Sequence, residues 1–180
     1  NVVNNCLLKA QGSSTDHRNV VFASDTWAGG NHGNYNTISK SVIDGGYYGI
    51  FNYGSGLSTL NNNSSNYFID IDIVNVTYYG MYNYYTKDSY FKNLKIKPTY
   101  TYGYPIYNYY AYGNRVDSCV LDGGSYGLYD YYSKYNVFRK NVIKNQRDHN
   151  VYCYYSEQEV FQKNELINPY YYNLYTYAAT

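Results

Sequence analysis

Two sets of apolar residues recur along the chain at nearly the same interval. Successive members of either set lie 22 to 35 residues apart, and the interval narrows to 22–25 residues in the second half of the chain. The first set is Val3, Ile38, Phe68, Phe91, Val116, Phe138 and Phe161. The second set is Val20, Ile50, Met81, Ile106, Leu128, Val151 and Leu174. Two columns that keep one period predict a stack of seven repeats.

Within each repeat, apolar residues alternate with other residues over short stretches, as in residues 138–143 and 161–166. Alternation with period two predicts short strands, and no segment shows an apolar face of period 3.6 over ten residues. We therefore expect almost no helix. The inward positions should form the core, with buried side chains at Ile43, Ile50, Ile73, Met81, Ile96, Leu121, Leu128, Ile143, Val151 and Leu166.

Glycine and asparagine mark the expected turns. The triplet Asp44-Gly45-Gly46 recurs as residues 122–124, and both triplets favour left-handed backbone angles. Gly or Asn also precedes most members of the second apolar set, and we interpret this column as one of positive φ. Its members are Gly49, Gly80, Gly127, Asn150 and Asn173, and Pro105 interrupts it.

Longer phrases recur as well. Residues 36–43 read NTISKSVI and residues 48–51 read YGIF, and similar phrases return at residues 136–143 and 126–129. In these phrases the chain resembles the right-handed parallel β-helix family, the pectate-lyase-like superfamily, and more closely the NosD-type repeat of the periplasmic copper pathway.

The resemblance covers nearly the whole chain and implies a specific all-β fold. This fold is a right-handed parallel β-helix (solenoid) of about seven coils of 22–25 residues, with longer N-terminal loops. We expect residues 1–180 to form a single β-helix domain, a segment or repeat unit of a longer protein, because the chain starts inside a repeat and stops just after a predicted strand. The resemblance says little about function, because the superfamily hosts lyases, hydrolases, adhesins and phage spikes.

Tyrosine occupies eleven of the twelve places that lie one and three residues after the second-set positions from Ile50 onwards. Because that position points inward, the residues one and three places later point outward on one sheet face. A further column, two residues before it, is tyrosine except at His149. The predicted face contains Tyr48, Phe51, Tyr53, Tyr79, Tyr82, Tyr84, Tyr107, Tyr109, Tyr126, Tyr129, Tyr131, Tyr152, Tyr154, Tyr175 and Tyr177.

This face has two interpretations. The rings can stack between coils as a ladder that only stabilises the sheet. Alternatively, a partner covers the rings, because a large exposed aromatic area is a liability for a free monomer. The partner would be another copy of the protein or a carbohydrate, since tyrosine combines a large apolar area with a hydrogen-bonding tip.

Charge and hydropathy exclude several partners. The net charge is +1 and only 15% of residues are charged, which argues against nucleic acid or an anionic membrane as the main partner. No run of 18 apolar residues exists, so we expect no membrane insertion. The family resemblance and a surface rich in Tyr, Asn, Ser and Gly favour a secreted or cell-surface location.

The three cysteines are expected to be unpaired and poorly accessible. Cys6 and Cys119 share one inward column but lie four repeats apart, which is roughly 19 Å at the coil spacing. A disulfide needs Cα atoms within about 7 Å. We therefore predict that these thiols, with Cys153, behave as small buried apolar groups.

The N-terminal insertions hold the other candidate site residues. His17, Asp25, Trp27 and His32 lie in two long loops, where His with Asp could bind a metal or transfer protons. Their spacing matches no metal signature, so we predict no metal and no cofactor. The neighbouring Asp70 and Asp72 are followed one repeat later by Asn93 and Lys95 rather than by further carboxylates.

The pectate-lyase-like enzymes use clustered Asp for calcium, and the polygalacturonase motifs Asn-Thr-Asp and Gly-His-Gly are missing from the chain. The sequence therefore favours a non-catalytic structural or adhesive extracellular protein that self-associates into a filament, sheath or fibre. The alternative is a carbohydrate-binding or polysaccharide-degrading β-helix protein.

Overall fold

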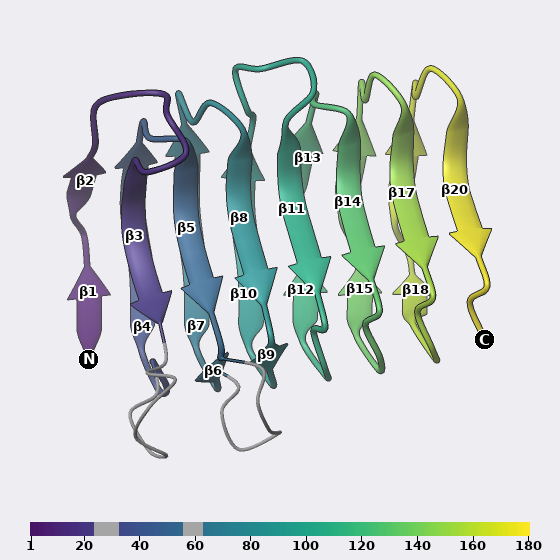
Figure 1. Ribbon diagram of the computed structural model, residues 1–180, viewed down its shortest axis with the longest axis horizontal. Helices are drawn as coiled ribbons and strands as arrows, with labels where there is room; N and C mark the ends of the chain where they lie inside the picture. Colours follow the sequence, from purple (N-terminus) through teal and green to yellow (C-terminus); the bar gives the residue numbers. More distant parts are fainter. Residues whose placement is uncertain (24–32, 56–62) are drawn as a thin grey trace.

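The computed structural model describes residues 1–23, 33–55 and 63–180. The described chain winds into seven coils around one long axis, with the N-terminus at one end and the C-terminus at the other (Figure 1). Each coil contributes strands to two parallel sheets. The described residues contain no helix.

The first sheet carries the first apolar set. In spatial order its main strands are β1 (Val2–Asn4), β4 (Thr37–Asp44), β7 (Tyr67–Val74), β10 (Tyr90–Ile96), β12 (Arg115–Asp117), β15 (Val137–Arg139) and β18 (Val160–Gln162). In four coils a bend separates a second short strand, and these are β2 (Leu7–Lys9), β13 (Val120–Asp122), β16 (Val142–Lys144) and β19 (Glu165–Ile167). At the equivalent position of every coil, whether or not the strand is divided there, one residue adopts a positive φ between 48° and 57°: Asn5, Lys40, Asp70, Asn93, Ser118, Lys140 and Lys163.

The second sheet carries the second apolar set. Its seven strands are β3 (Arg18–Ala23), β5 (Tyr48–Tyr53), β8 (Tyr79–Tyr84), β11 (Tyr104–Tyr109), β14 (Tyr126–Tyr131), β17 (His149–Tyr154) and β20 (Tyr172–Tyr177). A two-stranded sheet of β6 (Asn63–Ser64) and β9 (Thr86–Lys87) lies at one corner.

The register confirms the predicted columns. Ile50 pairs with Met81, Ile106 with Leu128, and Phe91 with both Phe68 and Val116, all in parallel strands. In Figure 1 strands β4 and β7 of the first sheet lie behind and point up, strands β5 and β8 of the second sheet lie in front and point down, and the chain advances from left to right, which makes the winding right-handed. The expected right-handed parallel β-helix of seven coils is therefore confirmed.

The core lies between the sheets and consists of the predicted aliphatic columns. Nine of the ten residues expected to be buried are no more than 2% exposed. The exception is Leu166, which is only partly buried. It lies in the last described coil, where a coil covers it on one side only. Its place in the inward column was therefore not enough to predict full burial.

The same effect corrects one cysteine prediction. Cys119 and Cys153 are unpaired and buried as expected, but Cys6 is exposed. Cys6 lies in the first described coil, which has a neighbouring coil on one side: the Ser41 hydroxyl of that coil accepts a hydrogen bond from the Cys6 backbone N–H at 3.1 Å. An inward column is buried only where coils lie on both sides.

The glycine column before the second apolar set has a different cause from the one predicted. The turn glycines Gly45 and Gly123 do have positive φ, of 83° and 73°. Gly80 and Gly127 do not: a Cβ added there would lie 2.1 Å and 2.2 Å from the Cγ2 atoms of Ile96 and Ile143. Glycine is therefore required at these positions for close approach of the two sheets rather than for backbone conformation.

We predict a large difference between two core truncations. Ile73→Ala, at a fully buried site, should lower the free energy of unfolding by about 2–5 kcal/mol. Leu166→Ala should lower it by clearly less, because water already reaches that side chain. Urea unfolding followed by circular dichroism measures both free energies. Equal losses in the two variants would contradict the view that a residue is fully buried only where coils lie on both sides of it.

We also predict selective thiol labelling of the native protein. A maleimide should modify Cys6 rapidly and Cys119 and Cys153 far more slowly, because only Cys6 is exposed. Peptide mapping by mass spectrometry identifies the labelled residue. Rapid labelling of Cys119 would show that the core columns are not closed.

Candidate functional site

The outward side chains of the second sheet form a continuous aromatic surface, which we call the tyrosine face. It contains all fifteen residues predicted for it, together with Tyr104, His149 and Tyr172, on strands β5, β8, β11, β14, β17 and β20. Parallel pairing in register places equivalent residues of neighbouring coils side by side, for example Tyr82, Tyr107 and Tyr129. The predicted location of these residues on one outer sheet is therefore confirmed.

The rings within a column stack face to face. Tyr82 and Tyr107 have centroids 5.2 Å apart with ring planes inclined by 2°, and Tyr107 and Tyr129 are 5.1 Å apart at 3°. The next column behaves alike, with Tyr84 and Tyr109 at 5.0 Å and 3°. These distances are close to the spacing of neighbouring strands, so the sheet itself sets the repeat of the ladder.

The third column meets the others at right angles. Tyr79 stacks on Tyr48 at 5.0 Å, but its ring is inclined by 76° to that of Tyr107. Edge-to-face contacts of this kind are favourable between aromatic rings. At His149 the stacking changes, because its ring is inclined by 57° to Tyr126 and by 85° to Tyr172.

A fourth aromatic column was missed by the sequence analysis. Tyr85, Tyr110, Tyr132 and Tyr155 follow the ends of four strands, and each has a positive φ of 47° to 50°. Their rings stack at 4.8 to 5.3 Å. The doubled tyrosines in the sequence, such as Tyr84-Tyr85, were the available signal, but positive φ is expected of Gly and Asn and not of tyrosine.

Stacking limits what the face presents to its surroundings. The rings inside the ladder are half-buried, whereas Tyr172 and Tyr177 in the last coil are 56% and 47% exposed. Because neighbouring rings cover each other's faces, an inner ring exposes its edge and its hydroxyl group. At the N-terminal end the Arg18 guanidinium lies 4.6 Å from the centroid of Phe51, a cation–π contact.

The electrostatics of the face follow from this packing. Burial, reinforced by the neighbouring phenols, raises the pKa of Tyr82, Tyr107 and Tyr129 well above the ordinary value for tyrosine. The inner phenols therefore remain neutral at physiological pH, and the aromatic columns between β5 and β14 contain no charged residue.

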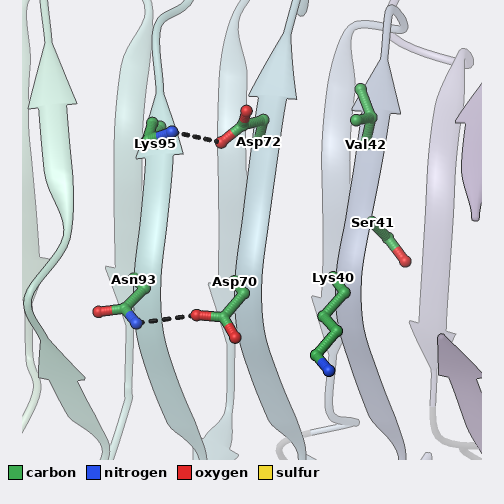
Figure 2. A pocket seen from close by; sticks show the side chains of 7 residues that line it. All are labelled: Lys40, Ser41, Val42, Asp70, Asp72, Asn93 and Lys95. Carbon is green, nitrogen blue, oxygen red and sulfur yellow. Dashed lines mark hydrogen bonds and ion pairs between the residues drawn. The ribbon is translucent and has the colours of Figure 1, made fainter. Parts of the chain in front are cut away.

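The outer face of the first sheet has a different character. Figure 2 shows a shallow hollow over β4, β7 and β10 that is lined by polar and charged side chains together with Val42. Asn93 donates a hydrogen bond to Asp70 at 2.8 Å, and Lys95 lies 3.4 Å from Asp72. The predicted pairing of these columns is confirmed, and it leaves each of the two carboxylates with a polar partner.

The second candidate site, in the N-terminal loops, is described only in part. His17 is exposed, and its Nδ1 accepts a hydrogen bond from the Ser14 amide at 3.1 Å. Asp25, Trp27 and His32 lie outside the described residues. Within residues 1–23, 33–55 and 63–180, no group of three or more His, Cys, Asp or Glu side chains could hold a metal ion. In the same residues, no helix is long and apolar enough to cross a membrane.

The raised tyrosine pKa values predict loss of stability at high pH. Tyrosines of the unfolded chain ionise near pH 10, whereas Tyr82, Tyr107 and Tyr129 keep their protons to higher pH in the folded chain. Above about pH 10 the unfolded state therefore binds fewer protons, and the free energy of unfolding falls as pH rises. Urea midpoints measured on both sides of this pH, with phenolate absorbance as a second signal, test this. A midpoint that is unchanged while the phenols ionise would contradict it.

Comparison with solved structures supports the fold. The chain is similar to the surface protein and adhesin PfbA of Streptococcus pneumoniae, with a TM-score of 0.54 and 14% sequence identity. The match covers 81% of this chain and 48% of that chain, so the present chain spans about half the length of its structural relative. At this identity the likeness concerns the fold alone. No protein with a curated description matches the chain.

A family model matches at the level of sequence. The model described as periplasmic copper-binding protein (NosD) matches residues 61–180, which is two thirds of the chain. These residues contain the last five of the seven coils, including the most regular part of the tyrosine face. The matching region and the repeat that it contains show that this chain belongs to the NosD family.

Proposed function

We propose that this protein is a non-catalytic structural or adhesive protein, secreted or held at the cell surface, that self-associates through its tyrosine face into a filament, sheath or fibre. The observation that carries the proposal is the face itself. Aromatic columns run unbroken over consecutive strands, in register and without charge, on a surface turned away from the core.

The core does not require this surface. The inward columns between the sheets already bury large apolar side chains in every inner coil. The outer face of the first sheet instead carries Lys, Asp and Asn, which shows that this fold accepts polar residues on an outward sheet face. Tyr85 and its equivalents also hold a left-handed conformation, which disfavours a residue other than glycine by about 1–2 kcal/mol. We attribute the retention of tyrosine at these unfavourable positions to selection for the aromatic surface.

A second copy of the chain suits the face better than a sugar does. Sugars usually dock on the exposed face of an aromatic ring, but the inner rings of the ladder have their faces covered by one another. A second tyrosine face offers the same edges and hydroxyls at the same repeat, so two copies can pair face to face about a two-fold axis. End-to-end stacking of the coils would then extend such pairs into a filament. The net charge of +1 opposes this contact very little.

Carbohydrate is the second candidate because two observations favour it. The hydroxyls of the ladder form rows of hydrogen-bonding groups at the coil repeat. Tyr172 and Tyr177 are more exposed than the inner rings, so a sugar ring could stack at the end of the ladder. Binding to a glycan array, absent in Tyr172→Ser/Tyr177→Ser, would support this function over self-association.

The location rests on the relatives. The NosD family is described as periplasmic, and PfbA is described as a surface protein and adhesin. Both descriptions place a β-helix of this kind outside the cytoplasm, and we extend that location to this chain.

We do not extend copper binding to the chain. Copper sites use His, Cys and Met ligands. In the part of the chain that the structure describes, His17 and His149 lie in the first and sixth coils, and Met81 is fully buried in the core. The Cys119 thiol is buried as well, and burial raises its pKa to about 12. These residues do not fit a copper site.

Substitution of the inner ladder tests the proposal. Replacing Tyr107, Tyr109, Tyr129 and Tyr131 with Ser should abolish or strongly weaken self-association while lowering the melting temperature only moderately, because the inward columns remain intact. Sedimentation velocity and electron microscopy measure assembly, and circular dichroism measures melting.

The matched control replaces four exposed tyrosines that lie off the face: Tyr35, Tyr67, Tyr135 and Tyr170. This variant should assemble like the parent protein. If the ladder variant melts early and yet assembles normally once folded, the ladder is only structural and the proposal is wrong.

A further inference from the structure

One interior corner of the coil is lined by amide side chains. Asn52, Asn83 and Asn108 are fully or almost fully buried at equivalent positions of β5, β8 and β11. Each donates to the next coil: Asn83 to the Asn108 Oδ1 at 2.9 Å, and Asn108 to the Asp130 Oδ1 at 2.9 Å. An amide suits such a column because it offers a donor on one side and an acceptor on the other.

A second polar column lies at the same corner, in the turn that follows each strand of the second sheet. The backbone N–H of Asn114 donates to the Asn136 Oδ1 at 2.8 Å. Asn136 in turn donates through Nδ2 to the Glu159 Oε1 at 3.2 Å. In both columns an acidic residue thus takes the place of the next amide, at Asp130 in one and at Glu159 in the other.

The two acidic residues end neighbouring columns at this corner, and each has one carboxyl oxygen without a donor. Asp130 is fully buried, and each of the two carboxyl groups perturbs the ionisation of the other, as expected of side chains that lie close together. The Oδ2 of Asp130 and the Oε2 of Glu159 are buried without any hydrogen-bond partner. Two acceptor-only groups in contact repel each other if both are ionised, and a buried acceptor without a donor is unfavourable.

No positive charge among the described residues relieves this. The other titratable group facing the pair is the Cys153 thiol, which follows Asp130 in its column and is itself buried. Ser156 donates its hydroxyl to the Asp130 backbone carbonyl at 3.0 Å, and Ser133 donates to the carbonyl of Tyr131. The nearby Lys134 is paired at the surface with Glu157 at 2.8 Å.

We propose that Asp130 and Glu159 share one proton across this corner, and that release of this proton as pH rises loosens the C-terminal coils. One carboxyl group donates its O–H to the unpaired oxygen of the other, which satisfies both atoms without a further ligand. On release the proton passes to water through a cavity at the C-terminal end that is lined by Glu159, Cys153, Ser156 and Thr180. The corner is therefore a pH-sensitive lock between β14 and the coils that follow it.

The direction of the effect follows from linkage. Burial, together with the neighbouring carboxyl group, raises the pKa of Glu159, and burial raises that of Asp130. Their contribution to stability is complete below about pH 4, where the unfolded carboxyls are also protonated. Above that pH the unfolded chain releases protons that the folded pair retains, so stability falls as pH rises towards the folded pKa values.

Two conservative variants test the lock. Asp130→Asn restores the amide that the other coils use, and Glu159→Gln does the same in the second column. Each should raise the melting temperature at about pH 8 and change it little at about pH 4. The exposed Asp72→Asn is the control and should not gain stability with rising pH. A gain of equal size at both pH values would show a simple packing effect and would overturn the proposal.

Thiol labelling tests where the structure opens. Cys153 lies beside the pair, whereas Cys119, equally buried, lies on the opposite sheet and serves as the internal reference. The ratio of Cys153 to Cys119 modification by a maleimide should rise several-fold between about pH 5 and pH 8 in the parent protein and remain constant in Asp130→Asn. A constant ratio in the parent, or the same rise in the variant, would overturn the proposal.

Discussion

A single coil of this protein cannot bury its own inward side chains. Only the coil before and the coil after can cover them, so the fold depends on stacking at one repeat distance. Parallel strands in register impose this distance on every column, and equivalent residues therefore lie one strand spacing apart. The same constraint that closes the core over Ile73 also aligns Tyr82 with Tyr107 and Asn83 with Asn108. Core, tyrosine face and polar corner are three consequences of one register.

This constraint explains why the fold could be predicted from the sequence. Two apolar columns with one period determine the coil, and alternation with period two determines which side chains point inward. It also explains the errors, because a column position does not reveal whether a neighbour lies on both sides. Cys6 and Leu166 have inward positions but lie in the first and last coils, and both are more exposed than expected.

Other features could not be predicted because they depend on contacts between columns. The glycines at 80 and 127 are required by isoleucine side chains of the other sheet, which no local pattern reveals. Tyr85 and its equivalents adopt a backbone conformation that tyrosine rarely takes. The tyrosine face itself was predictable, since its residues alternate with inward residues on the same strands.

The interior is more polar than the apolar columns indicate. Asn52, Asn83 and Asn108 are as deeply buried as the aliphatic residues, and they form hydrogen bonds along the axis of the coil. Such a column tolerates an error in register poorly, because a shifted amide leaves its partners unpaired. The acidic residues at 130 and 159 interrupt this order near the C-terminal end, where they couple the packing of the last coils to pH.

The central claim is that the tyrosine face is covered by another copy of the protein. Footprinting of tyrosine side chains by hydroxyl radicals over a dilution series tests it most directly. We predict that Tyr107 and Tyr129 are modified at low protein concentration and protected at high concentration, while Tyr35 and Tyr170, which lie off the face, are modified equally at both. Equal modification of Tyr107 and Tyr129 at every concentration, in samples that do assemble, would contradict the account.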